Sequence, residues 1–278
     1  RMGAPSERLE EVFQAHLRGE SEPRDDRPTL DERIAEVDRL GIEATVRARV
    51  PDLADAPGTA LFHPLIRLAY GIDSGHRGQV AAALLDWERR REDLPLVVGP
   101  PGDRRPEDIP DLLADAADGA WPGTFDLDAV ARRPAVAAAL DGLTDRVTVD
   151  DVSAFALRAH AASGTFITLH MVTGGRAVRT VAEVLEVPGS TKLLRHTIVA
   201  MTVALAAVGA PRPLDPATLD RRRRAAGLPS RTEVTRAAIA SDDPHVVKLV
   251  DVALAEEART GDLLHRDLAA RAAGFPIR

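Results

Sequence analysis

Apolar residues recur at spacings of three and four along most of this chain, and short breaks interrupt the pattern. Such spacing predicts amphipathic helices around a shared core. The clearest start lies at Thr29, where Glu32 completes a capping box for a helix that we expect to reach Leu40. The other helices expected from the pattern are 6–17, 60–72, 76–91, 106–117, 126–141 with a break or kink at Pro134, 149–172, 190–209, 215–226, 230–240, 243–260 and 261–273.

The breaks between these helices are rich in Gly and Pro and too short for interdomain linkers. Residues 98–102 and 120–123 are turns of this kind, and residues 94–98 are the one candidate for a short extended piece. Length alone permits one large domain or two small ones. The pattern favours one all-α domain over 1–278, a multi-helix bundle with a buried site between helices.

Composition narrows the classes of protein that fit. Hydrophobic residues make up 45% of the chain and aromatic residues only 3%, which favours helices with a core of Ala, Leu, Val and Ile. The formal charge of −7 argues against a nucleic-acid partner. The chain has no cysteine, which excludes disulfides and thiolate chemistry and fits a reducing cytoplasm.

The longest apolar run, residues 197–210, is shorter than a helix that crosses a bilayer. No signal peptide is visible at the N-terminus. The sequence therefore predicts a soluble, cytoplasmic protein without a membrane partner.

Several common catalytic motifs are missing from the sequence. It has no Gly-x-Ser-x-Gly elbow, no Gly-x-x-x-x-Gly-Lys-Ser/Thr loop and no Gly-x-Gly-x-x-Gly after a strand. The basic run 221–224 spreads around a helix, so we interpret it as a solvated face rather than a ligand site.

The eight histidines differ in their surroundings. His16, His76 and His265 lie among charged or small polar residues and are expected to be exposed. His63 begins an apolar helix before Pro64, where we expect it to face inward; His170 lies in a buried helix, and His245 follows Asp243-Pro244 at a helix start. Each of these three can simply be a hydrogen-bonded core histidine. Together they also suit a metal site between facing helices.

The chain has thirty-six basic residues, and only Lys192 and Lys248 among them are lysines. Unlike arginine, a buried lysine can lose its proton. A neutral amine can take up carbon dioxide to form a carbamate, which is an anionic oxygen ligand. Lys248 lies three residues after His245, on the same helix face, and imidazole with a carboxylate-like oxygen suits iron(II). The alternative is a surface lysine whose stem lies on apolar neighbours.

Three segments of the chain, in order, resemble hallmark stretches of the questin oxidase-like family: 62–71 (FHPLIRLAYG), 169–173 (LHMVT) and 243–248 (DPHVVK). The resemblance extends from Met2 to about Ala255. It implies oxidative ring opening of aromatic polyketides of the anthraquinone type. One branch of that family resembles non-haem iron dioxygenases, with iron held by four histidines and a carboxylated lysine.

If the three segments are matched to those of the family, the resemblance implies that the metal ligands and catalytic residues are His63, His170, His245 and carboxylated Lys248. An Asn-His segment that the family carries upstream of the stretch resembling residues 1–4 is absent here, which implies a missing N-terminal piece with the fourth histidine. His160 and His196 are its candidate substitutes. Other family members are NADPH-dependent, so NADPH is a candidate reductant, although the sequence has no dinucleotide fingerprint.

The hypothesis is therefore an oxygenase that uses dioxygen at Fe(II) on an aromatic small molecule, with Arg67 able to pair with a phenolate, with the carbamate or in a surface salt bridge. Three alternatives stay open. One is a metal-free helical protein that binds a planar aromatic ligand. The others are an NADPH-dependent Baeyer–Villiger-type oxidase without iron and a zinc-dependent hydrolase.

Overall fold

The computed structural model describes residues 28–96, 99–118, 121, 123–224 and 227–276. The regular elements in these ranges are all helical, apart from an isolated β-bridge between Arg104 and Leu143, and the expected all-α class is confirmed. The expected helix 6–17 and His16 lie outside the described residues. The expected extended piece 94–98 is described only as far as Leu96, without a strand.

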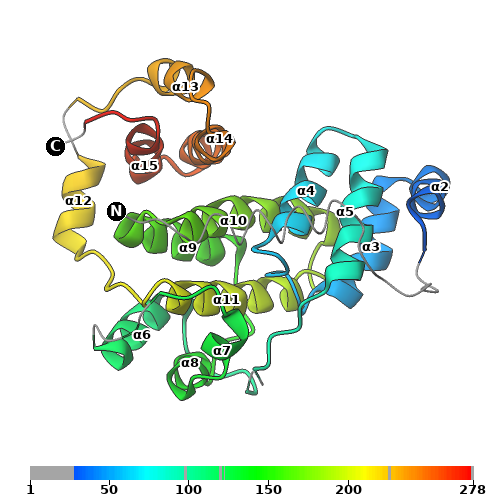
Figure 1. The fold of residues 1–278 in the computed structure, drawn as a ribbon, viewed down its shortest axis with the longest axis horizontal. Coiled ribbons are helices and arrows are strands. Elements are labelled where there is room, and N and C mark those ends of the chain that lie inside the picture. The colour runs from blue at the N-terminus through cyan, green and yellow to red at the C-terminus, as the bar shows by residue number, and fades with distance from the viewer. Residues whose placement is uncertain (1–27, 97–98, 119–120, 122, 225–226, 277–278) are drawn as a thin grey trace.

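The central helix of the fold is α10 (Phe166–Leu185), most of whose residues are buried. It packs against α9 (Val149–Ser163) and α11 (Thr191–Ala207), and all three cross the middle of Figure 1. Alanine, valine and leucine fill the contacts between them, as the low aromatic content predicts. This core places α10 between the N-terminal and C-terminal groups of helices.

The N-terminal group contains α2 (Leu30–Leu40), α3 (Ile42–Leu53), α4 (His63–Asp73) and α5 (Arg77–Arg90). The Thr29–Glu32 capping box begins α2 as expected, because the side chain of each residue accepts a hydrogen bond from the backbone of the other. The sequence pattern missed α3, whose apolar face is narrow and whose last turn contains Pro51. Figure 1 shows this group at one end of α10.

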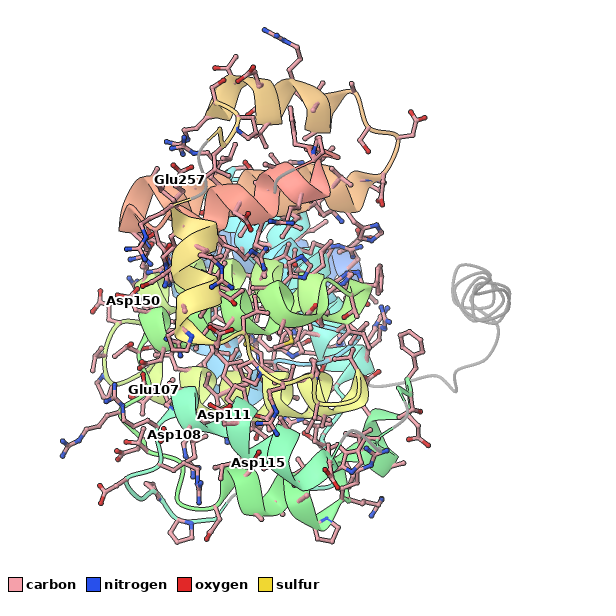
Figure 2. All side chains as sticks on the ribbon, turned by 90° about the vertical axis from the view of Figure 1, so that its left-hand side faces the viewer. Glu107, Asp108, Asp111, Asp115, Asp150 and Glu257 are labelled. Carbon is pink, nitrogen blue, oxygen red and sulfur yellow. The ribbon has the colours of Figure 1, made fainter. Side chains whose placement is uncertain are left out.

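A third group of short helices packs on α11, on the side away from the C-terminal helices (Figure 1). Its helices are η1 (Pro106–Asp108), α6 (Ile109–Ala117), α7 (Leu127–Ala131) and α8 (Pro134–Leu140). Pro134 separates α7 from α8, as the pattern indicated. Figure 2 shows an acidic edge along η1 and α6, formed by Glu107, Asp108, Asp111 and Asp115.

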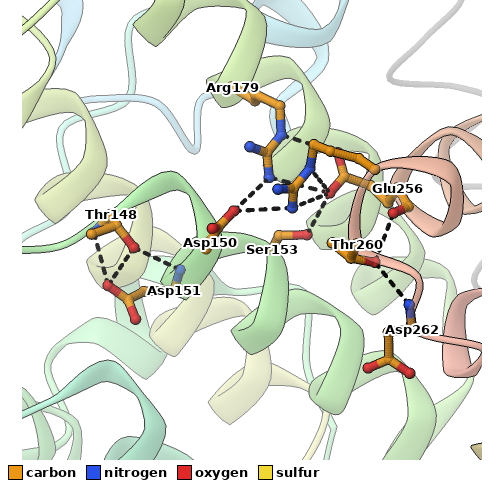
Figure 3. A network of polar contacts seen from close by, with 9 residues as sticks. Thr148, Asp150, Asp151, Ser153, Arg179, Glu256, Thr260 and Asp262 are labelled. Carbon is orange, nitrogen blue, oxygen red and sulfur yellow. Dashed lines mark hydrogen bonds and ion pairs between the residues drawn. The ribbon is translucent and has the colours of Figure 1, made fainter.

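The C-terminal group consists of α12 (Pro216–Arg223), α13 (Arg231–Ile239), α14 (Pro244–Thr260) and α15 (Leu264–Ala272). Helices α13 to α15 share a small core of their own, while Leu249 and Val252 of α14 belong to the main core. The buried ion pair between Arg179 of α10 and Glu256 of α14 joins the two at 3.0 Å (Figure 3). Helix α14 is thereby fixed along α10.

The predicted ends of one helix are wrong. The pattern predicted a single helix over 149–172, but Gly164, with φ +61°, ends α9 and Thr165 caps the start of α10. The new helix then continues to Leu185, well past the expected end. The break lets α10 fold back on α9 and brings its first turns toward α4 and α14.

Within the described ranges, no helix combines the length and apolar character needed to cross a membrane.

Candidate functional site

Three imidazole rings from distant parts of the chain lie together beside α10. The ring centroids of His63 and His170 are 4.8 Å apart, and those of His170 and His245 are 5.6 Å apart. Phe166 covers the cluster, with its ring centroid 4.3 Å from that of His170 and 5.0 Å from that of His245. The structure therefore brings together the three histidines that the sequence selected, and Phe166 joins them one turn before His170.

Local sequence explains why the rings meet. His63 is the first residue of α4 and His245 lies in the first turn of α14, where Pro64 and Pro244 are tolerated because those backbone nitrogens need no partner. Both helices pack on α10. Two helix starts therefore meet the second turn of α10, where His170 projects.

Each ring has an oxygen acceptor at its Nδ1 atom. His63 Nδ1 lies 2.5 Å from the carbonyl oxygen of Ala60, and His170 Nδ1 lies 2.9 Å from that of Phe166. His245 Nδ1 lies 2.9 Å from Oδ1 of Asp243. Since these oxygens accept, each Nδ1 is the donor, and in the neutral ring Nε2 keeps its lone pair. This is the arrangement found around metal-binding histidines.

Burial favours the neutral form of His63 and His170. His170 is only 2% exposed, and burial lowers its pKa to about 4, with the charges of His63, His245 and Lys248 adding to the effect. Burial also lowers the pKa of His63, although its outer edge is open to solvent. His63 was expected to face inward, and it lies instead at the rim of the cluster because it begins α4 at the protein surface.

Lys248 lies close enough for its charge to act on His63 and His170. It is half-buried and, among the described residues, makes no hydrogen bond or ion pair. Lys192 differs: it is exposed and its Nζ lies 3.0 Å from Oδ2 of Asp55. The two lysines therefore occupy different environments, and only Lys248 adjoins the histidines.

The donor atoms do not yet form a coordination sphere. Across the described ranges, no three His, Cys, Asp or Glu side chains are arranged so that they could hold a metal ion. Two imidazoles on one ion, at metal–nitrogen distances of about 2.1 Å, have ring centroids roughly 4.5–5.5 Å apart. The observed 4.8 Å lies within that range and 5.6 Å lies just above it, so the centroid spacings of these two pairs do not by themselves place the three Nε2 atoms around one ion.

A groove with a volume of about 730 Å³ opens between α4, α13 and α14, and its described lining includes Lys248 but none of the three clustered histidines. Lys248 lines it, as does Tyr70, two turns after His63 on α4. Its apolar rim is exposed, with Tyr70 at 41%, Val247 at 40% and Ile239 at 72%. A flat molecule in this groove would lie beside Lys248.

The other histidines lie elsewhere. His265, expected to be exposed, is only 4% exposed, because α15 packs against α14 on that side, and its Nδ1 is buried without a hydrogen bond. His160 is buried and its Nδ1 lies 3.0 Å from Thr168 Oγ1. His196 lines a separate cavity with Asp55, and His76 is exposed and caps α5. His160 and His196 do not belong to the described ring cluster.

Two expectations about arginines have different outcomes. Arg67 is exposed and pairs with Asp86 at 4.0 Å, which is the surface alternative. The run 221–224 is not simply a solvated face, because Arg222 donates to the buried Asp267 at 2.7 Å and Arg223 pairs with Asp262 at 2.9 Å. These contacts attach α12 to the start of α15 and to the turn before it.

The sequence matches no known protein-family model and has no significant similarity to any curated protein.

Proposed function

We propose that this protein is a non-haem iron oxygenase in which His63, His170 and His245 hold the metal. The observation that supports the proposal best is the shared hydrogen bonding at Nδ1, which leaves each Nε2 atom free in the neutral ring. Burial lowers the pKa of His63 and of His170, which further favours the neutral, metal-binding form of these two rings.

The proposal assigns Lys248, as a carbamate, to the remaining protein ligand. Its half-buried position beside two rings and the lack of a partner among the described residues support this role. Uptake of carbon dioxide joins the neutral amine nitrogen to carbon and releases one proton. The carbamate oxygen would then offset the positive charge of the bound metal.

The substrate in this proposal is a planar aromatic polyketide of the anthraquinone type, as the resemblance of segments 62–71, 169–173 and 243–248 implies. The apolar groove along Tyr70 and Val247 suits the flat face of such a molecule. Iron(II), when bound, supplies the single-electron chemistry that lets dioxygen react with a spin-paired aromatic compound. The residues of the chain orient the ring system, and Phe166 helps to exclude water from the histidines.

Metal binding by single variants tests the proposal. The protein should take up one iron(II) per chain under anaerobic conditions, and His63→Ala, His170→Ala and His245→Ala should each lower the affinity at least tenfold. His76→Asn is the matched control, because it changes an exposed histidine and keeps the N-cap of α5. Equal iron binding by all four variants and the wild type would disprove the ligand set.

Activity is tested separately with an oxygen electrode and a hydroxylated anthraquinone. The iron-loaded protein should consume dioxygen only when this substrate is present, with or without NADPH. Lys248→Met should abolish the effect of added bicarbonate, and mass spectrometry under gentle conditions should detect carbon dioxide on the wild-type lysine. Turnover in the absence of dioxygen would indicate a hydrolase instead.

A metal-free binding protein for a planar aromatic ligand is the second candidate. It is favoured by the donor atoms of the described residues, which do not form a ready coordination group. This candidate predicts tight binding of the anthraquinone to protein treated with a chelator, without oxygen uptake. It also predicts that His245→Ala leaves this affinity unchanged.

A further inference from the structure

The segment that joins α3 to α4 has an unusual backbone conformation directly before His63. Ala60, Leu61 and Phe62 have φ values of 47°, 54° and 67°. Residues other than glycine adopt this left-handed conformation singly rather than in runs, because the Cβ atom crowds the following carbonyl oxygen. Strained backbone of this kind persists only where surrounding contacts hold it, and it collects at functional sites. The left-handed turn 60–62 therefore depends on residues that fix it.

This turn determines which atom the ring of His63 meets. The carbonyl oxygen of Ala60 accepts from the backbone nitrogen of His63 at 3.3 Å and lies 2.5 Å from Nδ1 of the same residue. A neutral imidazole carries one proton, so an acceptor at Nδ1 leaves the lone pair on Nε2. If the turn relaxed to negative φ values, the Ala60 carbonyl would point elsewhere and either ring nitrogen could hold the proton. The conformation of the turn thus sets the tautomer of His63.

Two side chains connect the turn to the segment that follows α5. Oε2 of Glu92 accepts from the backbone nitrogen of Ala60 at 3.0 Å. In the other direction, Oγ1 of Thr59 accepts from the backbone nitrogen of Glu92 at 3.2 Å. The same hydroxyl donates to the carbonyl oxygen of Ala56 at 2.8 Å. Two opposed hydrogen bonds therefore join residue 92 to the start of the turn.

Both ends of this arrangement are anchored in the core. The carbonyl oxygen of Ala56 also accepts from Nε1 of Trp87 at 2.8 Å, and Trp87 is fully buried in α5. Thr59 is fully buried as well, so water cannot replace the partners of its hydroxyl. On the other side, the ring of Phe62 is buried against Gly174 of α10. The turn is clamped between α5 and α10.

We propose that Thr59 and Glu92 are positioning residues for the histidine cluster. They hold the turn 60–62 so that the Ala60 carbonyl keeps the proton of His63 on Nδ1 and leaves Nε2 free. The use of that Nε2 atom by a metal rests on the proposed function, whereas the tautomer itself needs no metal. Thr59 has the larger effect, because it is fully buried and Glu92 is exposed.

Nitrogen-15 NMR of the metal-free protein tests the proposal, because its chemical shifts distinguish the two tautomers of an imidazole. His63→Gln identifies the signals of His63, which in the wild type should show the proton on Nδ1. Thr59→Val, which has nearly the same shape without the hydroxyl, should populate the other tautomer, and Glu92→Ala should do so to a smaller extent. His170 should keep its tautomer in every variant, because its Nδ1 partner lies in its own helix.

Conservative variants separate hydrogen bonding from side-chain volume. Thr59→Ser keeps the hydroxyl and Glu92→Gln keeps an oxygen that can accept from Ala60, so both should resemble the wild type. Asp93→Ala is the matched control at the next residue, because Asp93 is 64% exposed and pairs with Arg91 rather than with the turn. It should leave the tautomer of His63 unchanged.

Iron(II) affinity distinguishes this inference from the proposed function. In Thr59→Val the affinity should fall about tenfold, as is typical when a ligand histidine loses its orienting partner. A wild type that binds no iron would overturn the proposed function, and the tautomer would still decide this inference. If Thr59→Val does not fold, Glu92→Ala, at an exposed position, decides it alone. An unchanged tautomer of His63 in the folded variants, or an equal change at His170, would overturn the positioning role.

Discussion

The ring of Phe62 lies against the backbone of α10 at Gly174, where a Cβ atom on residue 174 would come within 2.9 Å of Cγ of Phe62. This contact lets the turn before α4 approach α10 closely. His63, the next residue, thereby reaches His170, with the two ring centroids 4.8 Å apart. The absence of a side chain at one position of α10 is thus part of what holds the histidine cluster together.

Gly174→Ala should therefore destabilise the protein, even though alanine favours helices. The added methyl group overlaps the Phe62 ring, and overpacking of this kind costs about 1–3 kcal/mol. Gly175→Ala is the matched control, because its nearest neighbour outside the helix backbone would be Val152 at 3.7 Å, an ordinary contact. That variant should gain up to about 1 kcal/mol from helix propensity. Urea denaturation measures both, and equal free energies of unfolding for the two variants would contradict the packing argument.

The buried pair of Arg179 and Glu256 supports a second prediction. Both side chains are buried, and Ser153 also bonds to the Glu256 carboxylate (Figure 3), as does Arg259. Glu256→Ala leaves the Arg179 guanidinium without its main buried partner, so the free energy of unfolding should fall by about 3–5 kcal/mol. Replacing both residues, as in Arg179→Met with Glu256→Leu, should restore much of the loss. Urea denaturation is again the measurement.

The exposed pair of Arg212 and Asp115 is the control for that experiment. Its two atoms are 2.8 Å apart, but both side chains are more than 60% exposed, at 63% and 68%. Since solvent screens such a pair, Asp115→Ala should change stability by no more than about 1 kcal/mol. A similar loss for Asp115→Ala and Glu256→Ala would show that burial does not set the difference.

His160 gives the protein a dependence on pH that is separate from the histidine cluster. Burial, with a contribution from the charge of Arg222, lowers its pKa from 6.5 to about 4. Between these two values the unfolded chain binds the proton and the folded chain does not. The contribution of His160 to the free energy of unfolding is therefore complete above pH 6.5. It decreases as the pH falls toward 4, by at most about 1.4 kcal/mol per pH unit.

Unfolding in urea at a series of pH values checks this effect. In His160→Gln the free energy of unfolding should fall less steeply between pH 6.5 and 4 than in the wild type. The curves should run parallel above pH 6.5, where both states carry a neutral ring. Parallel curves over the whole range would mean that His160 does not titrate differently in the two states.

Much of the fold was predictable because its signals are local. The capping box at Thr29 and the break at Pro134 are read from neighbouring residues, and both appear in the structure. The break at Gly164 was missed because the apolar pattern continues across it. Helix α3 was missed because its apolar face is too narrow to stand out. In both cases the spacing of apolar residues does not define where the helix begins or ends, and tertiary packing does.

The candidate site was predictable only in part. Apolar surroundings singled out His63 and His170, and a helix start after Asp243-Pro244 singled out His245; the structure places these three rings together. Reasoning from neighbouring residues also placed His265 at the surface, and there it was wrong, because α15 buries that side chain. Polar neighbours in the sequence do not show which side of a helix packs. Ala60, Leu61 and Phe62, directly before His63, form a turn with positive φ values. The sequence gives no signal for this turn, because none of the three residues is glycine.

Asp243 connects the candidate metal site to helix capping. Its Oδ1 accepts from the backbone nitrogen of His245 at 2.8 Å and from Nδ1 of the same residue at 2.9 Å. Asp243→Ala should therefore cost about 1 kcal/mol of stability as a lost cap. It should also lower iron(II) affinity about 10–100-fold, because His245 loses the partner that fixes its tautomer and orientation.

Asp215 provides the matched control, because it caps α12 through the backbone nitrogen of Thr218 at 2.9 Å and has no histidine partner. Asp215→Ala should lose similar stability, measured by urea denaturation, and keep the iron affinity of the wild type. Asp243→Asn adds a finer comparison: its amide oxygen can still cap α14, but it accepts more weakly from the imidazole than a carboxylate. Its iron affinity should fall between that of the wild type and that of Asp243→Ala. If Asp215→Ala and Asp243→Ala lower iron affinity equally, the loss comes from general destabilisation, and His245 is not oriented for a metal by Asp243.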